Sequence, residues 1–214
     1  MWVLVALLLA PVAAAAEGPD AATILEGLQD WLDGSRTLSG RFEQSLVSGA
    51  FGEGVRESGL IWIDRPGRMR WDYTDPEAKT AILDGSDTLF YEQEARQMMT
   101  GTLEDGGGML AALLTGEERL ADLFTARRIQ RPDLTEGRGW FLELAPTTAE
   151  EAFEQITLFV GRRYQLHAVE VLDASGNRVL YRFSNLKRNV DIPEAIFRFQ
   201  PPEGTEILGE APGE

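Results

Sequence analysis

Alternating apolar and polar residues mark the region around residue 70 as a β-hairpin. Met69, Trp71 and Tyr73 are separated by polar residues, so their side chains fall on one face of a strand. The apolar run at residues 60–63 predicts a partner strand, and the Pro-Gly pair at 66–67 supplies the turn. An aromatic strand face of this kind needs either a core or an apolar ligand to cover it.

Further strands follow along the chain. They are predicted at residues 37–47, 78–83, 88–92, 96–100, 126–130, 140–144, 156–160, 166–172, 179–186 and, as a short last strand, 197–199. Asp84-Gly85 between apolar runs is typical of a hairpin turn. Because no long helical pattern separates the early strands, we expect the sheet to be antiparallel.

Helical spacing occurs at the start and in the middle of the chain. Asp20 is a helix N-cap candidate, and the apolar residues that follow share one helical face up to Gly34. Three glycines at 106–108 precede two short apolar segments at 109–114 and 117–124. These segments are either a movable cover over the sheet or an ordinary helical excursion that packs on it. The residues expected in such a lid are Leu28, Trp31, Met109, Leu110, Leu113 and Leu114.

Together these elements predict an α+β fold in a single domain. So many antiparallel strands must curl to protect their edges, which gives a half-open β-barrel of roughly ten or eleven strands. The N-terminal helix and the short central helices would form a helical lid over its mouth. The expected domain spans residues 17–209, and residues 210–214 are expected to be a disordered tail.

Residues 1–16 have the pattern of a secretory signal peptide. They are uncharged and mostly apolar, and they end in an Ala-x-Ala cleavage pattern. The segment is too short to span a membrane. We therefore expect export of the mature chain.

Composition and motifs exclude several classes of function. The net charge of −15 gives no electrostatic footprint for nucleic acid. The chain has no cysteine, and its single histidine, His167, lies in a predicted strand, where a structural role is expected. No nucleophile, P-loop or metal-binding motif occurs, so we expect no catalysis, no cofactor and no metal site.

Four short motifs, in this order and spacing, carry a family resemblance. They are Phe42-Glu43-Gln44, then Arg65-Pro66 before the Met, Trp and Tyr of the hairpin, then Asp84-Gly85 before Leu89-Phe90-Tyr91, and finally residues 197–204. The chain resembles the periplasmic carriers of outer-membrane lipoproteins, the LolA family. The resemblance covers most of the chain after residue 20 and implies an unclosed barrel with a helical lid.

The resemblance also implies a function and partners. It implies a periplasmic monomer that shields lipoprotein acyl chains, receives them from an inner-membrane ABC release complex and passes them to an outer-membrane receptor. The candidate lipid-binding residues are the apolar residues of the strands, namely Phe42, Leu60, Trp62, Met69, Trp71, Tyr73, Phe90 and Met98.

Arg65 matches the family's lid latch, in which a guanidinium group bonds to the cover helices when no cargo is bound. An exposed arginine paired with Asp64 or Asp72 is the alternative, and Asp64 would also compete for the latch.

Two other functions stay open. A carrier of another lipid, such as a glycolipid, would have the same shape. A secreted lipid hydrolase belongs to a different class, and the missing nucleophile motif argues against it. The outer-membrane receptor shares the fold but needs a lipid-modified cysteine, which this chain lacks.

Overall fold

The computed structural model describes residues 18–49, 54–103, 108–116, 118–131, 138–147 and 153–209. The expected signal peptide and the expected tail both lie outside these residues. Within them, no helix is long and apolar enough to cross a membrane.

One open sheet organises the described part of the chain. Its twelve strands are β1 Thr37–Val47, β2 Gly54–Asp64, β3 Arg68–Asp75, β4 Lys79–Asp84, β5 Asp87–Glu92, β6 Gln97–Thr102, β7 Phe124–Ile129, β8 Gly139–Pro146, β9 Phe153–Gly161, β10 Leu166–Asp173, β11 Arg178–Arg188 and β12 Glu206–Leu208. The spatial order is β12-β6-β5-β4-β3-β2-β1-β11-β10-β9-β8-β7. β12 and β7 are the two edges, so the barrel does not close.

In the described part of the chain, three α-helices accompany the sheet, namely α1 Ala21–Asp33, α2 Gly108–Thr115 and α3 Leu120–Leu123. Asp20 caps α1 as predicted, because its carboxylate accepts a hydrogen bond from the Thr23 N–H at 2.8 Å. The predicted helix at 117–124 is shorter in the structure. Phe124 already has extended backbone and pairs with Pro146 as the first residue of β7.

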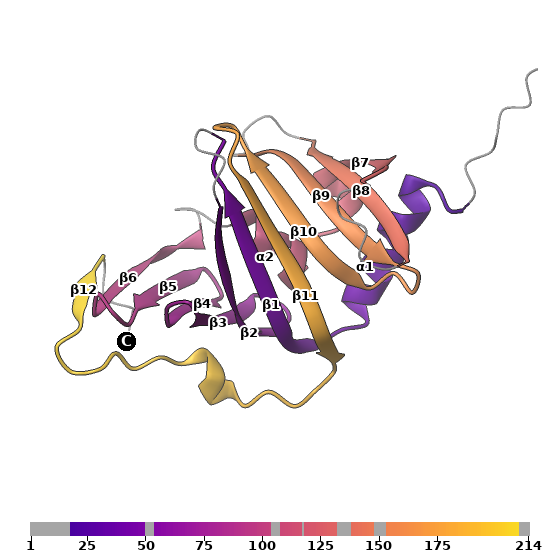
Figure 1. The fold of residues 1–214 in the computed structure, drawn as a ribbon. Coiled ribbons are helices and arrows are strands. Elements are labelled where there is room, and N and C mark those ends of the chain that lie inside the picture. Colours follow the sequence, from indigo (N-terminus) through magenta and orange to yellow (C-terminus); the bar gives the residue numbers. More distant parts are fainter. Residues whose placement is uncertain are drawn as a thin grey trace, which may run out of the picture.

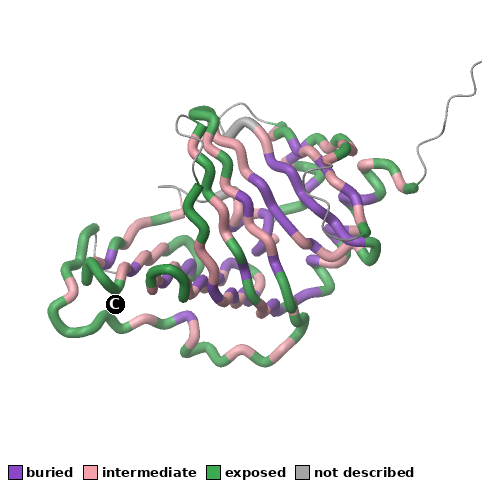
Figure 2. Tube along the Cα trace, viewed as in Figure 1, coloured by how far each residue is buried: buried purple, intermediate pink, exposed green. Residues whose placement is uncertain are grey.

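The strongly curved sheet encloses α1 and α2 on its inner face (Figure 1). α1 packs against β7 and β8, and α2 packs against β2 and β3. Leucines and isoleucines of α1 join those of α2, α3 and the inner strand faces in one hydrophobic core. Figure 2 shows the buried positions concentrated on β8 to β10 and on the helices. One end of the barrel is therefore filled by a helix.

The C-terminal segment covers the outer face of the other end, and here the sequence prediction was wrong. Residues 197–199 form no strand, because Glu194–Phe197 is a 3-10 helix (η3) that packs on β3 and β4. Arg70 of β3 donates a hydrogen bond to the Ile196 carbonyl at 2.7 Å. The last strand is instead β12, which follows the two prolines and pairs with β6 in parallel.

Candidate functional site

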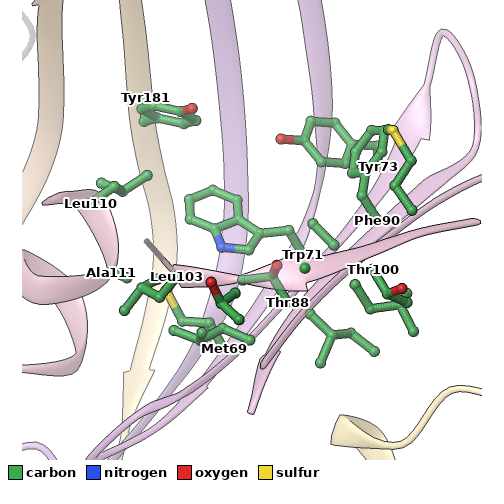
Figure 3. A pocket seen from close by; sticks show the side chains of 17 residues that line it. Met69, Trp71, Tyr73, Thr88, Phe90, Thr100, Leu103, Leu110, Ala111 and Tyr181 are labelled. Carbon is green, nitrogen blue, oxygen red and sulfur yellow. The ribbon is translucent and has the colours of Figure 1, made fainter. Parts of the chain in front are cut away.

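A cavity of about 640 Å³ opens on the inner face at the end of the sheet that α1 does not fill. Its walls come from β3, β4, β5 and β6, with α2 and β11 at the side (Figure 3). The lining residues are Met69, Trp71, Tyr73, Ala81, Ile82, Leu83, Thr88, Leu89, Phe90, Met99, Thr100, Gly101, Thr102, Leu103, Leu110, Ala111 and Tyr181. The volume lies within the range of about 300–1,000 Å³ that is usual for small-molecule sites.

Strand register explains how residues distant in sequence form one wall. Trp71 pairs with Ala81, Ala81 with Phe90, and Phe90 with Met99, so these four side chains form a row across β3 to β6. Paired residues in a sheet point to the same face, and here that face is the inner one. None of the described residues that line the cavity is charged. The site is therefore suited to a mostly apolar, uncharged ligand.

Four of the strand residues predicted for lipid binding lie at this wall, namely Met69, Trp71, Tyr73 and Phe90. Phe42 does not line the cavity. It is 1% exposed and packs edge-on against Trp71 and Tyr73, with ring centroids 4.7 Å and 4.8 Å away. Phe42 therefore supports the wall from the side, on the same face of the sheet as Tyr73.

The other three predicted strand residues lie elsewhere. Leu60 and Trp62 pair with Asp72 and Arg70, which places them on the outer face, where they line a shallow groove. Met98 is also on the outer face and is 2% exposed, because it pairs with Tyr91 in the region that the C-terminal segment covers. The neighbouring Met99 occupies the cavity position instead.

The predicted lid residues also separate. Leu110 of α2 lines the cavity, whereas Leu28, Leu113 and Leu114 are buried in the core. Trp31 faces away from the cavity and carries the Arg188 guanidinium over its ring at 5.1 Å. The side chain of Met109 lies outside the described residues.

Arg65 reaches from the β2–β3 turn to the C-terminal end of α2. Its Nε–H donates to the Thr115 carbonyl at 2.8 Å, and Nη2 donates to the Gly116 carbonyl at 3.2 Å. Carbonyls at a helix C-terminus lack partners within the helix and are partly negative, so a cation there is stabilising. The side chain is only 8% exposed, and this burial lowers the pKa of the guanidinium while Asp33 opposes the shift.

Arg65 is also connected to α1 and α3. Its Nη2 donates to Asp33 Oδ1 at 3.3 Å, and Gln29 donates to the same oxygen at 2.9 Å. Gln29 in turn accepts a hydrogen bond from the Leu120 N–H at 2.9 Å. Sequence reasoning missed Asp33 and Gln29. The available signal was two polar residues at i, i+4 spacing on a helix whose remaining face is apolar.

The expected competitors for Arg65 have other partners. Asp64 is paired with Arg68, and Asp72 accepts a hydrogen bond from Arg70 at 2.8 Å. Arg65 is therefore buried and bonded through Nε and Nη2, while its buried Nη1 has no hydrogen-bond partner among the described residues. The alternative of an exposed arginine paired with Asp64 or Asp72 is wrong.

Gly116 makes the close approach of Arg65 to α2 possible. Its φ is +64°, a conformation that side chains other than glycine rarely adopt. A Cβ at this position would overlap the Arg65 guanidinium. Gly116 therefore ends α2 and also leaves the space in which the arginine lies.

The single histidine lies away from the cavity. His167 stacks on Phe159 with ring centroids 5.3 Å apart, does not line the cavity, and has its pKa lowered by burial. Among the described residues, no group of three or more His, Cys, Asp or Glu side chains could hold a metal ion.

Comparisons with known proteins agree with the fold and the motifs. The family model described as outer membrane lipoprotein carrier protein LolA matches residues 33–200. A relative from Dechloromonas aromatica (strain RCB), named outer-membrane lipoprotein carrier protein, is 32% identical over 188 residues, covering 87% of this chain and 88% of the relative. A relative of the same name from Ralstonia nicotianae (strain ATCC BAA-1114 / GMI1000) is 32% identical over 206 residues, covering 94% of this chain and 93% of the relative.

Among solved structures, an uncharacterized conserved protein from Thermus thermophilus has the same fold. Its TM-score is 0.54 at 12% identity, with 87% of this chain and 97% of that chain covered. The family model spans well over half of the chain, and the relatives named above match nearly all of it. The chain therefore belongs to the outer membrane lipoprotein carrier protein LolA family.

Proposed function

We propose that this protein is a periplasmic carrier that shields the acyl chains of lipoproteins and shuttles them from the inner to the outer membrane. The observation that carries the proposal is the uncharged cavity of about 640 Å³ between the inner face of β3 to β6 and α2. The pattern of a secretory signal at residues 1–16 supports export, and family membership supports lipoproteins as cargo.

The physical task is to replace the membrane for a short time. Each buried CH₂ group contributes about 0.8 kcal/mol, so an acyl chain does not leave a membrane unless comparable apolar burial is available. The row of Trp71, Ala81, Phe90 and Met99 offers such burial, and Leu110 of α2 covers it from the side.

We further propose that Arg65 is the latch of the lid. Its bonds to Thr115 and Gly116 hold the end of α2 when the cavity is empty, and cargo entry would break them. Hydrogen bonds to a charged group contribute about 1.5–3 kcal/mol each, enough to bias an open–closed equilibrium without locking it. The proposed donor of cargo is an inner-membrane ABC release complex, and the proposed acceptor is an outer-membrane receptor.

The carrier function is tested by asking whether the protein keeps a lipoprotein in solution. A triacylated lipoprotein in detergent is mixed with the purified protein, the detergent is diluted, and soluble complexes are measured by size exclusion. We expect a soluble complex with the acylated form and none with the unacylated form. A soluble complex with a glycolipid but not with the lipoprotein would favour a carrier of another lipid.

Trp71 and Trp62 give a matched pair of variants, because they lie on opposite faces of the same hairpin. Trp71→Ala removes apolar contact area from the cavity wall, so we expect about tenfold weaker binding or more. Trp62→Ala should bind like the unchanged protein. Thermal unfolding of both variants separates lost binding from lost stability. Equal binding by the two variants would contradict the assignment of the cavity.

A further inference from the structure

Two tyrosine hydroxyls lie over the apolar wall of the cavity. Tyr73 comes from β3 and Tyr181 from β11, and both line the cavity. Figure 3 shows their phenol oxygens pointing toward one another across Trp71. The rings of Trp71 and Tyr181 are tilted with centroids 5.4 Å apart. Polar groups have thus been placed inside a site whose other walls are mostly apolar.

A chain of hydrogen bonds fixes the role of the Tyr73 hydroxyl. Tyr73 donates to Gln44 Oε1 at 2.8 Å, and Gln44 donates to Glu57 at 3.2 Å. Lys79 donates to the same carboxylate at 2.8 Å. Because the hydroxyl proton of Tyr73 is already donated to Gln44, the hydroxyl oxygen can only accept hydrogen bonds from a ligand in the cavity.

The Tyr181 hydroxyl is the complementary group. Within the described residues it makes no hydrogen bond, so its O–H is an unused donor. Burial, first of all, and the nearby Glu57 carboxylate raise the pKa of Tyr181 to about 12, and burial also raises the pKa of Tyr73. Both hydroxyls therefore stay protonated at any physiological pH. The cavity thus presents one donor and one acceptor side by side.

The electrostatics around these hydroxyls disfavour an anion. None of the lining residues that the structure describes is positively charged, so a carboxylate or phosphate that entered would find no counterion among them. Glu57 acts on both tyrosines with its negative charge. A neutral carbonyl group needs a hydrogen-bond donor and no counterion, and Tyr181 supplies that donor.

We propose that Tyr181 and Tyr73 form a subsite for the neutral ester or amide carbonyl through which an acyl chain is joined to its parent molecule. The Tyr181 O–H donates to the carbonyl oxygen, and the Tyr73 oxygen accepts from an amide N–H where one is present. The cavity thereby selects neutral acyl derivatives over free fatty acids and other anionic lipids. This inference rests on the proposed function, since it assumes that the cavity takes acyl chains, and it adds which end group they carry.

The test is a competition experiment with the full-length exported protein and a neutral, polarity-sensitive dye bound in the cavity. The competitors are methyl laurate, N-methyl lauramide and laurate, which share one chain length and differ in the end group. At about pH 8 laurate is fully ionised. We expect the ester and the amide to displace the dye at concentrations about tenfold lower than laurate does, or lower still.

Variants separate the hydroxyl from the rest of the wall. Tyr181→Phe should weaken binding of the ester and the amide by about three- to tenfold relative to its effect on the directly measured dye affinity, the equivalent of one neutral hydrogen bond. Tyr91→Phe is the matched control, because Tyr91 lies on the outer face against Phe199. Glu57→Gln keeps a polar side chain beside Gln44 and Lys79 but removes the negative charge. The ratio of laurate to ester concentration needed to displace the dye should therefore become smaller.

Two results would overturn the inference. If laurate binds as tightly as methyl laurate, or if Tyr181→Phe leaves ester binding unchanged, the subsite is wrong while the carrier function stands. If neither the dye nor any of the three acyl compounds binds the unchanged protein, the subsite and the carrier function fail together.

Discussion

Arg65, in the turn between β2 and β3, connects the sheet to the helices by hydrogen bonds. One guanidinium bonds to two carbonyls at the end of α2 and to a carboxylate of α1, and that carboxylate is shared with the glutamine that holds α3. Arginine suits this position because its planar fork presents several donors at fixed angles. A lysine would keep the charge and lose most of the bonds.

We expect Arg65→Leu to fold and to accept cargo but to release it poorly. Two or more hydrogen bonds to the charged group are lost, each contributing about 1.5–3 kcal/mol, so the closed state that expels cargo becomes less favourable. The measurement is transfer of bound lipoprotein to the outer-membrane receptor. Release at the rate of the unchanged protein would end the latch hypothesis.

Two further variants test whether cargo release depends on the contact between Arg65 and the end of α2, and not merely on a positive charge in the hairpin. Gly116→Ala leaves Arg65 intact but places a methyl group where the guanidinium lies, so it should release cargo as poorly as Arg65→Leu. Arg68 lies on the same hairpin, where its guanidinium pairs with Asp64 and lies over the Phe197 ring, and Arg68→Leu removes that group. It should release cargo normally.

The sequence predicted which face of the sheet a side chain lies on for some residues and not for others. Alternation around Trp71 predicted its face, because one side of that strand is apolar and the other is polar. The neighbouring strand is apolar on both sides around Trp62, so the pattern contained no information about which face is inner. Met98 and Met99 are adjacent and alike, and only the pairing of Met99 with Phe90 decides which one faces the cavity.

At the scale of elements, α2 is the part of the site that we expect to change position. It has eight residues, and isolated helices shorter than about 12–15 residues are marginal in water. Its position therefore depends on its contacts with the core and on Arg65. The sheet beneath it is held by ladders of backbone hydrogen bonds on both sides of β1 and β2.

We expect the amides of α2 to exchange with solvent faster than those of β1 and β11. Opening of a short helix costs less than opening of a central strand, because fewer buried contacts and hydrogen bonds are lost. Hydrogen exchange followed by mass spectrometry measures this directly, and Arg65→Leu should accelerate exchange in α2 while leaving β10 unchanged. Protection of α2 equal to that of the central strands would mean that it is fixed scaffold.

Strand positions were more predictable than the short helices and the C-terminal segment. Strands such as residues 37–47 carry a repeating pattern, and the structure has β1 at those residues. Phe197 and Phe199 also alternate, yet they belong to a segment that crosses the outer face of β3 to β5, where burial of single aromatic side chains replaces strand pairing. The alternation was there, but its cause was packing against another layer.

At the scale of the whole molecule, the curved sheet encloses more volume than its helices fill. α1 occupies the part under β7 to β10, and the part under β3 to β6 is left as the cavity. Apolar walls that face an unfilled space lose the contacts that a packed core would provide, so the empty protein is less stable than it would be with that space filled. A ligand that fills the cavity should therefore stabilise the fold as well as bind to it.

This trade-off gives a prediction for Ala81, which lies between Trp71 and Phe90 in the cavity wall. Ala81→Leu adds apolar atoms to the unfilled space, and partial burial of those atoms contributes about 1 kcal/mol, so the thermal midpoint should rise by about 2–4 °C. The same side chain takes space from the ligand, so the rise in midpoint caused by a saturating acyl ester should be smaller than in the unchanged protein. Thermal unfolding with and without the ester measures both effects. An unchanged midpoint without ligand, together with a full ligand-induced rise, would show that the space at Ala81 is neither costly to the fold nor used by the cargo.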